Sequence, residues 1–196
     1  MQRFILTGAP GSGKTSVLSY LEGKGYSVVG EAATDVIAAE HARGVDEPWL
    51  DPSFIGKIID LQRSRQLAAA AAGPQYFDRS PVCTLALARY LGHPESGPLA
   101  SELSRIAGLY QPKVFFIRLL GSIEPTAARR ITYAESQEFE RVHEAAYREF
   151  GYHLIDIGPM SVVLRASLVA RHSSHRPPRP DGGRRGGRSR WPDSPT

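Results

Sequence analysis

The sequence predicts a three-layer α/β/α sandwich built on a parallel sheet of about five strands. Short apolar segments alternate with longer segments of helical composition along most of the chain, which is the order that βα units produce. Residues 114–117 (VFFI) are apolar at every position, as expected of a parallel strand that is covered on both faces. A glycine-rich turn separates the first strand from the first helix, and 196 residues are enough for one sizeable core.

The elements follow from local composition. Strands are expected where apolar, β-branched or aromatic residues cluster, at residues 3–7, 26–31, 75–80, 113–120 and 152–158. Helices are expected between them, at residues 14–22, 32–43, 52–72, 81–91, 99–110, 124–151 and 161–171. Pro52 suits the first turn of its helix, with Asp51 before it as the cap, and Gly73-Pro74 should end that helix. Residues 44–51 are expected to form a loop.

The net positive charge of the chain comes from its C-terminal segment. The formal net charge is +4, but the segment from residue 171 holds seven of the 24 basic and two of the 20 acidic residues, so residues 1–170 carry −1. We therefore expect a nucleotide-binding domain at 1–170 and a disordered Arg/Pro/Gly-rich tail at 171–196. Contact of this tail with nucleic acid or an acidic surface is an open alternative, and a solvated extension is the preferred interpretation.

Two further features bear on location. No run of about 18 apolar residues is present, so no transmembrane span is expected. The one cysteine, Cys83, allows no internal disulfide and suits a reducing compartment, so a cytoplasmic protein is expected. Cys83 itself is expected to be a small buried apolar residue.

The turn after the first strand is a phosphate-binding loop. It reads G-A-P-G-S-G-K-T and matches the pattern G-x-x-x-x-G-K-[ST] between a strand and a helix. In this pattern the backbone N–H groups surround the β-phosphate, Lys14 reaches the β- and γ-phosphate oxygens, and the Thr15 hydroxyl ligates Mg²⁺. The expected fold is thus a P-loop NTPase fold that binds ATP, or alternatively GTP, with Mg²⁺. The expected nucleotide-binding residues are Gly8, Ala9, Pro10, Gly11, Ser12, Gly13, Lys14, Thr15 and Ser16.

Missing motifs narrow the class. No apolar strand ends in Asp-Glu, which a motor or AAA+-type ATPase requires, and the apolar segment 114–117 is followed by Arg118. The guanine-binding N-K-x-D and the switch D-x-x-G of Ras-like GTPases are also absent. Both classes are therefore disfavoured.

Charged residues follow two other strands, where α/β folds place their ligands. Glu31 follows the second strand, and Asp78-Arg79 ends the third. Either carboxylate could accept a proton from a substrate hydroxyl, Asp78 could hold Mg²⁺, and Arg79 could bind substrate or phosphate oxygens. Purely structural alternatives are a helix-capping role for Glu31 and a local ion pair for Asp78-Arg79. His143 is expected on a polar helix face or in a lid.

The motifs together carry a resemblance. The strings GAPGSGKT, GYSVVGEAAT, IIDLQRSR, FDRSPVCTLALARYLG and REFGYHLIDIG, in this order over about residues 2–170, resemble the small P-loop family related to the nicotinamide riboside kinase domain. That family is often catalogued as an AAA-type ATPase domain, and the deoxynucleoside and thymidylate kinases are similar too. The sequence departs from the family pattern in two places: no second acid follows Asp78-Arg79 closely, and the lid arginines are reduced to Arg129 and Arg130.

The resemblance implies a role for each matching residue. Glu31 would be the general base or orient the acceptor hydroxyl, and Asp78 with Arg79 would bind Mg²⁺ and the substrate or transferred phosphoryl group. Gln62 would hydrogen-bond the acceptor. Arg129 or Arg130 would close over ATP and stabilise charge on the γ-phosphoryl group.

The sequence therefore predicts a Mg-ATP-dependent kinase that acts on a small hydroxyl- or phosphate-bearing, nucleoside-like acceptor. The alternative is a regulatory or adaptor NTPase that hydrolyses ATP or GTP slowly and uses its basic tail to contact RNA, anionic lipid or a protein partner. A third interpretation, a degenerate binder without catalysis, fits the reduced lid.

Overall fold

The computed structural model describes residues 2–69, 73–121 and 131–173. Arg129 and Arg130, the predicted lid arginines, lie outside the described residues. So does the predicted tail, apart from Arg171, His172 and Ser173.

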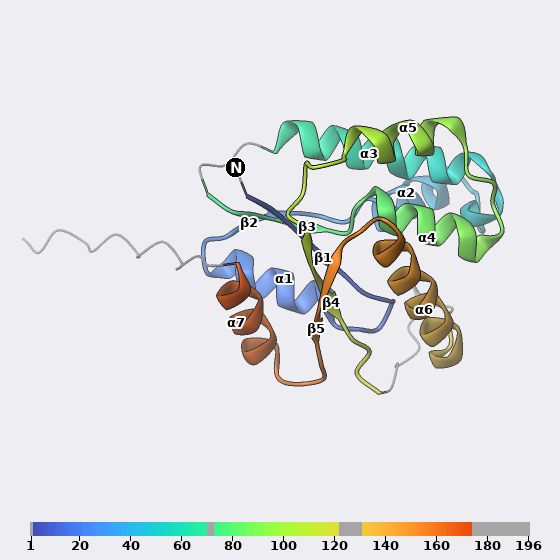
Figure 1. The fold of residues 1–196 in the computed structure, drawn as a ribbon. Helices are drawn as coiled ribbons and strands as arrows, with labels where there is room; N and C mark the ends of the chain where they lie inside the picture. Colours follow the sequence, from blue (N-terminus) through green and yellow to red (C-terminus); the bar gives the residue numbers. More distant parts are fainter. Residues whose placement is uncertain (1, 70–72, 122–130, 174–196) are drawn as a thin grey trace, which may run out of the picture.

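Five parallel strands form the sheet in the order β2-β3-β1-β4-β5, which confirms the predicted fold class (Figure 1). The strands are β1 (Arg3–Thr7), β2 (Ser27–Val29), β3 (Gln75–Asp78), β4 (Lys113–Ile117) and β5 (His153–Ile157). The helices are α1 (Lys14–Gly23), α2 (Ala33–Ala42), α3 (Ser53–Ala68), α4 (Pro81–Leu91), α5 (Gly97–Arg105), α6 (Tyr133–Glu149) and α7 (Val162–His172), with a 3-10 turn at Pro48–Leu50.

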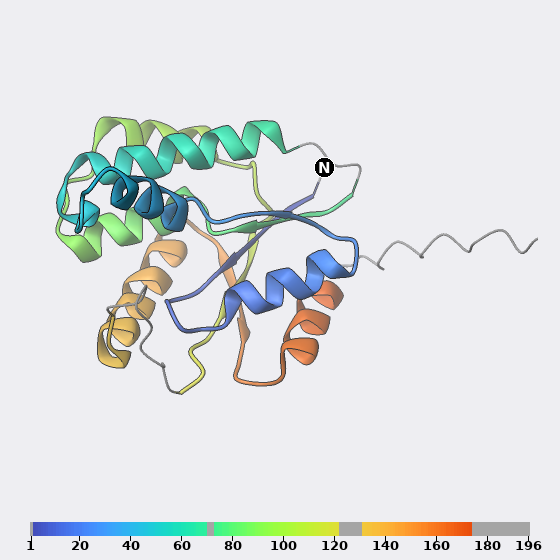
Figure 2. The same ribbon diagram turned by 180° about the vertical axis from the view of Figure 1, so that it is seen from behind.

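Helices cover both faces of the sheet (Figures 1 and 2). Side chains alternate along a strand, so on β1 the side chain of Ile5 joins the core under α2 to α6. The side chains of its neighbours Phe4 and Leu6 join a second core against α1 and α7. Burial on both faces explains the continuous apolar run of β4, where Val114 enters the first core and Phe115 the second.

Several elements differ from the sequence prediction at their ends, among them two helices and one loop of the region 44–110. The helix predicted at 52–72 spans Ser53–Ala68, because the backbone is already extended at Ala69, and the predicted positions 70–72 lie outside the described residues. The helix predicted at 99–110 is shifted to Gly97–Arg105, because Pro98 fits its first turn and Ser96 accepts a hydrogen bond from Leu99 N–H. The loop predicted at 44–51 contains the 3-10 turn, and the prediction that Asp51 caps the following helix agrees with its hydrogen bond from Ser53 N–H at 2.8 Å.

The topology places the functional strand ends together. β3 lies between β1 and β2, so the phosphate loop after β1, Glu31 after β2 and Asp78 at the end of β3 occupy one edge of the sheet. Among the described residues, no helix is both long and apolar enough to cross a membrane.

Candidate active site

The phosphate loop joins β1 to α1 and requires glycine at two positions. Gly8 has φ +152°, and a Cβ there would lie 2.3 Å from the carbonyl oxygen of Ile117, which is too close for any side chain. Gly13 has φ +76° and immediately precedes α1. The backbone of β4 and the start of α1 therefore fix the course of the loop.

A cavity of about 1250 Å³ extends from this loop across the ends of β2 and β3. Of the predicted nucleotide-binding residues, eight line it: Ala9, Pro10, Gly11, Ser12, Gly13, Lys14, Thr15 and Ser16. Gly8 is not among the lining residues, and it packs against the backbone of Ile117 at the end of β4. Thr15 is exposed to the cavity, whereas the aliphatic part of Lys14 is buried.

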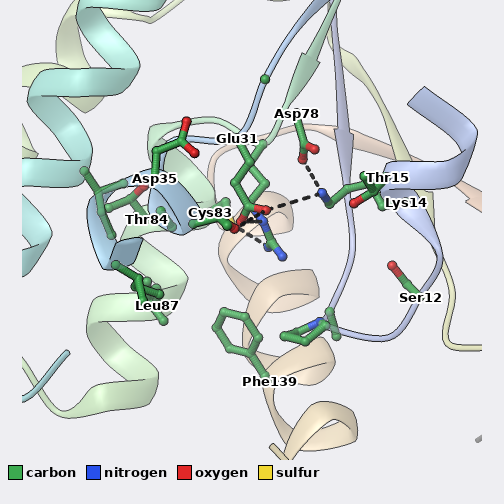
Figure 3. A pocket seen from close by; sticks show the side chains of 18 of the residues that line it. Ser12, Lys14, Thr15, Glu31, Asp35, Asp78, Cys83, Thr84, Leu87 and Phe139 are labelled. Carbon is green, nitrogen blue, oxygen red and sulfur yellow. Dashed lines mark hydrogen bonds and ion pairs between the residues drawn. The ribbon is translucent and has the colours of Figure 1, made fainter. Parts of the chain in front are cut away.

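Lys14 reaches the two carboxylates that the sequence singled out (Figure 3). Its Nζ atom forms an ion pair with Asp78 Oδ1 and lies 3.9 Å from Glu31 Oε2. Arg79 Nε lies 2.6 Å from the other oxygen, Glu31 Oε1. Two cations and two carboxylates thus form one cluster on the cavity wall, and each carboxylate has at least one cation in contact.

The two carboxylates differ in their ionisation. Burial favours the protonated form of Glu31, but the adjacent Arg79 and Lys14 outweigh it and hold the pKa of this carboxyl below its ordinary value. Burial raises the pKa of Asp78, and Lys14 only partly opposes this because the charge of Glu31 adds to it. Glu31 is also the more open of the two, with 21% of its side chain exposed against 7% for Asp78. Glu31 is therefore the carboxylate that is both ionised and accessible.

Arg79 is held in an unusual backbone conformation. Its φ of 71° makes it the one non-glycine residue of the described part of the chain with positive φ, although its N–H still donates to Leu6 O at 2.9 Å and continues the β3 ladder. Its Nη1 atom donates to Cys83 Sγ at 3.1 Å and lies 3.3 Å from His143 Nε2. The ion pair with Glu31 and these two contacts fix the orientation of the guanidinium group.

His143 and Cys83 contact Arg79, which sequence reasoning did not predict, although Cys83 is buried as expected. His143 Nε2 lies 2.7 Å from Cys83 Sγ, and His143 is 0% exposed, so its predicted place on a polar face or lid is wrong. Burial, with Arg79 beside it, lowers the pKa of His143 well below 6.5, so the imidazole is neutral. Burial raises the pKa of Cys83, which favours its thiol form. The position of His143, four residues after Phe139 and four before Tyr147 on the buried face of α6, was the available signal.

Arg65 on α3 holds the turn that carries Glu31. Its Nη1 atom donates to Gly30 O at 3.1 Å and to Glu31 O, and its Nη2 atom pairs with Asp35. The turn between β2 and α2 is thereby fixed to α3. Sequence analysis did not identify Arg65.

The part of the cavity around Gln62 combines one polar side chain with apolar and aromatic ones, as pockets for small organic molecules commonly do. Gln62 lines it, and its Oε1 atom accepts a hydrogen bond from Thr84 Oγ1 at 3.0 Å. The apolar and aromatic residues around it include Ile37, Trp49, Phe54, Ile58, Leu87 and Tyr90. An apolar or aromatic group fits between these side chains.

The donor set suits Mg²⁺ when phosphates complete it. Within the described ranges no group of three or more His, Cys, Asp or Glu side chains could hold a metal ion by itself. The Thr15 hydroxyl and the Asp78 carboxylate are hard oxygen donors on the same wall of the cavity. Mg²⁺ in nucleotide sites commonly takes only one or two protein ligands and completes its shell with phosphate and water.

Comparisons with known proteins identify a family and a shared fold. The model of a family described as an AAA domain matches residues 3–165. The structure is similar to that of deoxyadenosine kinase from M. mycoides with bound dATP, with a TM-score of 0.58, 12% identity, and coverage of 89% of this chain and 100% of that chain. A second structure of that kinase, with the products dCMP and a flexible dCDP, gives a TM-score of 0.57 at 12% identity and covers 88% and 99% of the two chains. No curated protein matches the sequence. At this identity the likeness establishes a shared fold.

Proposed function

The chain belongs to the AAA domain family over residues 3–165, and from this premise we propose that it is a kinase that transfers a phosphoryl group from ATP, or from GTP, to a small acceptor. The acceptor carries a hydroxyl or phosphate group and is nucleoside-like. The observation that carries the proposal is the position of Glu31, an accessible carboxylate held between Lys14 and Arg79 on the wall of one continuous cavity. A protein that only binds a nucleotide has no need of this arrangement beside its phosphate loop.

The phosphate loop and Lys14 bind the triphosphate. The backbone N–H groups of the loop and the N-terminus of α1 offer positive partial charge to the β-phosphate. Lys14 contacts Asp78 and Glu31 and can exchange part of these contacts for phosphate oxygens. Its burial limits its motion, so the amine stays where charge develops during transfer.

Thr15 and Asp78 are the residues that would hold Mg²⁺. When bound, the ion neutralises charge on the triphosphate. The raised pKa of Asp78 means that this carboxyl binds a cation in competition with a proton, and Lys14 keeps it in place.

Glu31 orients the acceptor hydroxyl and takes its proton as the new bond forms. This assignment over Asp78 rests on exposure, because 21% of the Glu31 side chain is exposed and only 7% of the Asp78 side chain. Arg79 holds Glu31 in place and adds positive charge near the transferred group. Arg129 or Arg130 completes this charge from the lid, a role that stays a prediction because neither lies among the described residues.

Gln62 and its apolar neighbours bind the body of the acceptor. The amide offers hydrogen bonds, and Trp49, which is only partly buried, offers a surface on which a planar ring can pack. The residues of this part of the cavity support a nucleoside-like acceptor, as does the resemblance to nucleoside and nicotinamide riboside kinases.

A screen for phosphoryl transfer tests the proposal. The full chain is incubated with γ-labelled ATP and Mg²⁺ against nucleosides, nucleoside monophosphates and other small hydroxyl compounds. We expect label in at least one acceptor with the wild-type protein and none with Lys14→Ala. Hydrolysis of ATP with no labelled acceptor would instead favour the regulatory or adaptor NTPase.

A further inference from the structure

Arg165 is a buried cation that has no carboxylate partner within residues 2–69, 73–121 and 131–173. It lies in the first turn of α7 and is 1% exposed. Buried arginines normally pair with an acidic group because an uncompensated charge in the protein interior is costly. Burial accordingly lowers the pKa of Arg165, although a guanidinium group remains charged at neutral pH. The described part of the chain supplies no counter-charge for it, and a bound anion could supply one.

The guanidinium group donates to one backbone carbonyl within the phosphate loop and to another just after β4. Nη1 donates to Ser12 O at 2.7 Å, and Nη2 donates to Arg118 O at 2.9 Å, just after β4. Its Nε atom is buried without a hydrogen-bond partner in the described structure. Arg165 therefore ties the loop to the end of β4 from outside the cavity, where α7 packs beside α1 (Figure 2).

The contact with Ser12 O fixes one amide of the loop. In a trans peptide the C=O and N–H groups point in opposite directions, so a Ser12 carbonyl directed at Arg165 turns the Gly13 N–H away from it. Ser12 and Gly13 both line the cavity. The absence of a side chain at Gly13 leaves room for the arginine, because a Cβ at this position would lie 3.0 Å from Arg165 Nη1.

We propose that Arg165 is a positioning residue of the phosphate site, which holds the Gly13 N–H toward the bound phosphate and whose unpaired charge is balanced by the polyphosphate. A hydrogen bond from a cation polarises the Ser12–Gly13 peptide and strengthens its N–H as a donor. The inference rests on the proposed nucleotide site but not on the identity of the acceptor. Arg165 does not touch the ligand; it acts through the loop.

Binding of Mg-ADP to the full-length protein tests this role without any turnover. The affinity is measured by calorimetry for wild type, Arg165→Met, Arg165→Lys and Arg165→Gln, together with the melting temperature of each protein without ligand. Arg171→Met is the matched control, because it removes an exposed arginine from the other end of α7. We expect Arg165→Met to weaken ADP binding by about ten- to a hundredfold, the loss that corresponds to a charge-assisted hydrogen bond. Arg165→Lys should recover most of the affinity, Arg165→Gln little of it, and Arg171→Met should bind as wild type.

The outcomes separate the possible failures. If Arg165→Met binds ADP as tightly as wild type, or if Lys restores no more than Gln, the positioning role is overturned. Lost affinity that follows the drop in ligand-free melting temperature equally in all three Arg165 variants would show a merely structural residue and would also overturn it. If Arg165→Met does not fold, the comparison of Lys with Gln decides alone. A wild-type protein that binds no ADP would overturn the proposed function itself, and this inference with it.

Discussion

Glu31 Oε1 and Arg79 Nε lie 2.6 Å apart, and this ion pair joins the ends of two neighbouring strands, β2 and β3, on the cavity wall. Other contacts hold both residues in place. Arg65 fixes the backbone on the Glu31 side, and Arg79 is fixed by its positive φ and by its contact with Cys83. The pair is thus a preformed part of the cavity wall, which is the property expected of groups that stabilise charge during a reaction.

Glu31→Gln should lower phosphoryl transfer while nucleotide binding persists. The amide keeps the size of the side chain but cannot accept a proton, and general-base catalysis contributes about a hundred- to ten-thousandfold. We therefore expect the turnover number to fall by about a hundredfold or more. The dissociation constant for Mg-ATP, measured by calorimetry, should change by less than about threefold, since Lys14 and the loop remain intact.

Glu138→Gln is the control for this substitution, because Glu138 lies on α6 and forms an ion pair with Arg141 on the same helix. It should leave both quantities unchanged. Equal losses of binding and turnover in Glu31→Gln would make Glu31 a structural residue and would contradict its role in transfer.

Lys14→Ala should abolish triphosphate binding. The substitution removes the amine that contacts both carboxylates, and it leaves two negative groups facing the triphosphate. Calorimetric titration with Mg-ATP should show no saturable binding. Lys24→Ala, at the other end of α1, is the control and should bind as wild type. ATP turnover at the wild-type rate in Lys14→Ala would contradict the assignment of the site.

The fold and the phosphate loop were predictable from the sequence because their signals are local. An apolar run such as 114–117 and the spacing of the glycines depend on neighbours in the chain, and both were interpreted correctly. Glu31 and Asp78 were expected close together because parallel strands end at one edge of the sheet, and the structure brings both to Lys14. What sequence reasoning could not supply were the residues that hold Arg79 and the phosphate loop in place.

The residues that hold Arg79 and the phosphate loop in place are buried polar residues on helices. His143 and Arg165 each occupy the apolar face of a helix, four residues from the buried Tyr147 and Val169 respectively. Spacing alone marks such positions as buried, but it does not tell which strand or loop lies opposite. The contact with Arg79, or with Ser12 O, follows only from the way that α6 and α7 pack on the sheet.

Arg79→Lys should reduce transfer although the charge is kept. The single amine of a lysine can contact either Glu31 or Cys83. It cannot contact both at once, as the planar guanidinium group does through its separate N–H donors. We expect the turnover number to fall by about a hundredfold, as when a positioned donor is removed from a transition state. The steady-state KM for ATP should change much less. If the turnover number stays at the wild-type value, positive charge alone is sufficient at this position.

Thr84→Val should affect the acceptor and not the nucleotide. Valine preserves the shape of threonine but loses the hydrogen bond to Gln62 Oε1, so the amide is free to rotate. The loss of about 1 kcal/mol corresponds to a rise of about fivefold in the KM for the acceptor. The KM for ATP is the internal reference and should not move. Ser104→Ala, an exposed position on α5, is the control variant. An unchanged acceptor KM would separate Gln62 from acceptor binding.

The buried His143 should make the protein less stable in mild acid. Its pKa lies well below 6.5 in the folded state because it is buried and faces Arg79, so below pH 6.5 the unfolded chain takes up a proton that the folded one does not. The contribution of His143 to the free energy of unfolding is complete above pH 6.5 and is lost as the pH falls toward the folded pKa, with a slope that approaches about 1.4 kcal/mol per pH unit.

Urea unfolding between pH 7.5 and 5.5 measures this slope. His143→Gln should reduce the slope of the unfolding free energy against pH. His153→Gln removes an exposed histidine at the start of β5 and should leave this slope unchanged. Equal slopes in wild type and His143→Gln would mean that the imidazole becomes protonated in place beside Arg79, and the neutral form assigned to it would then be wrong.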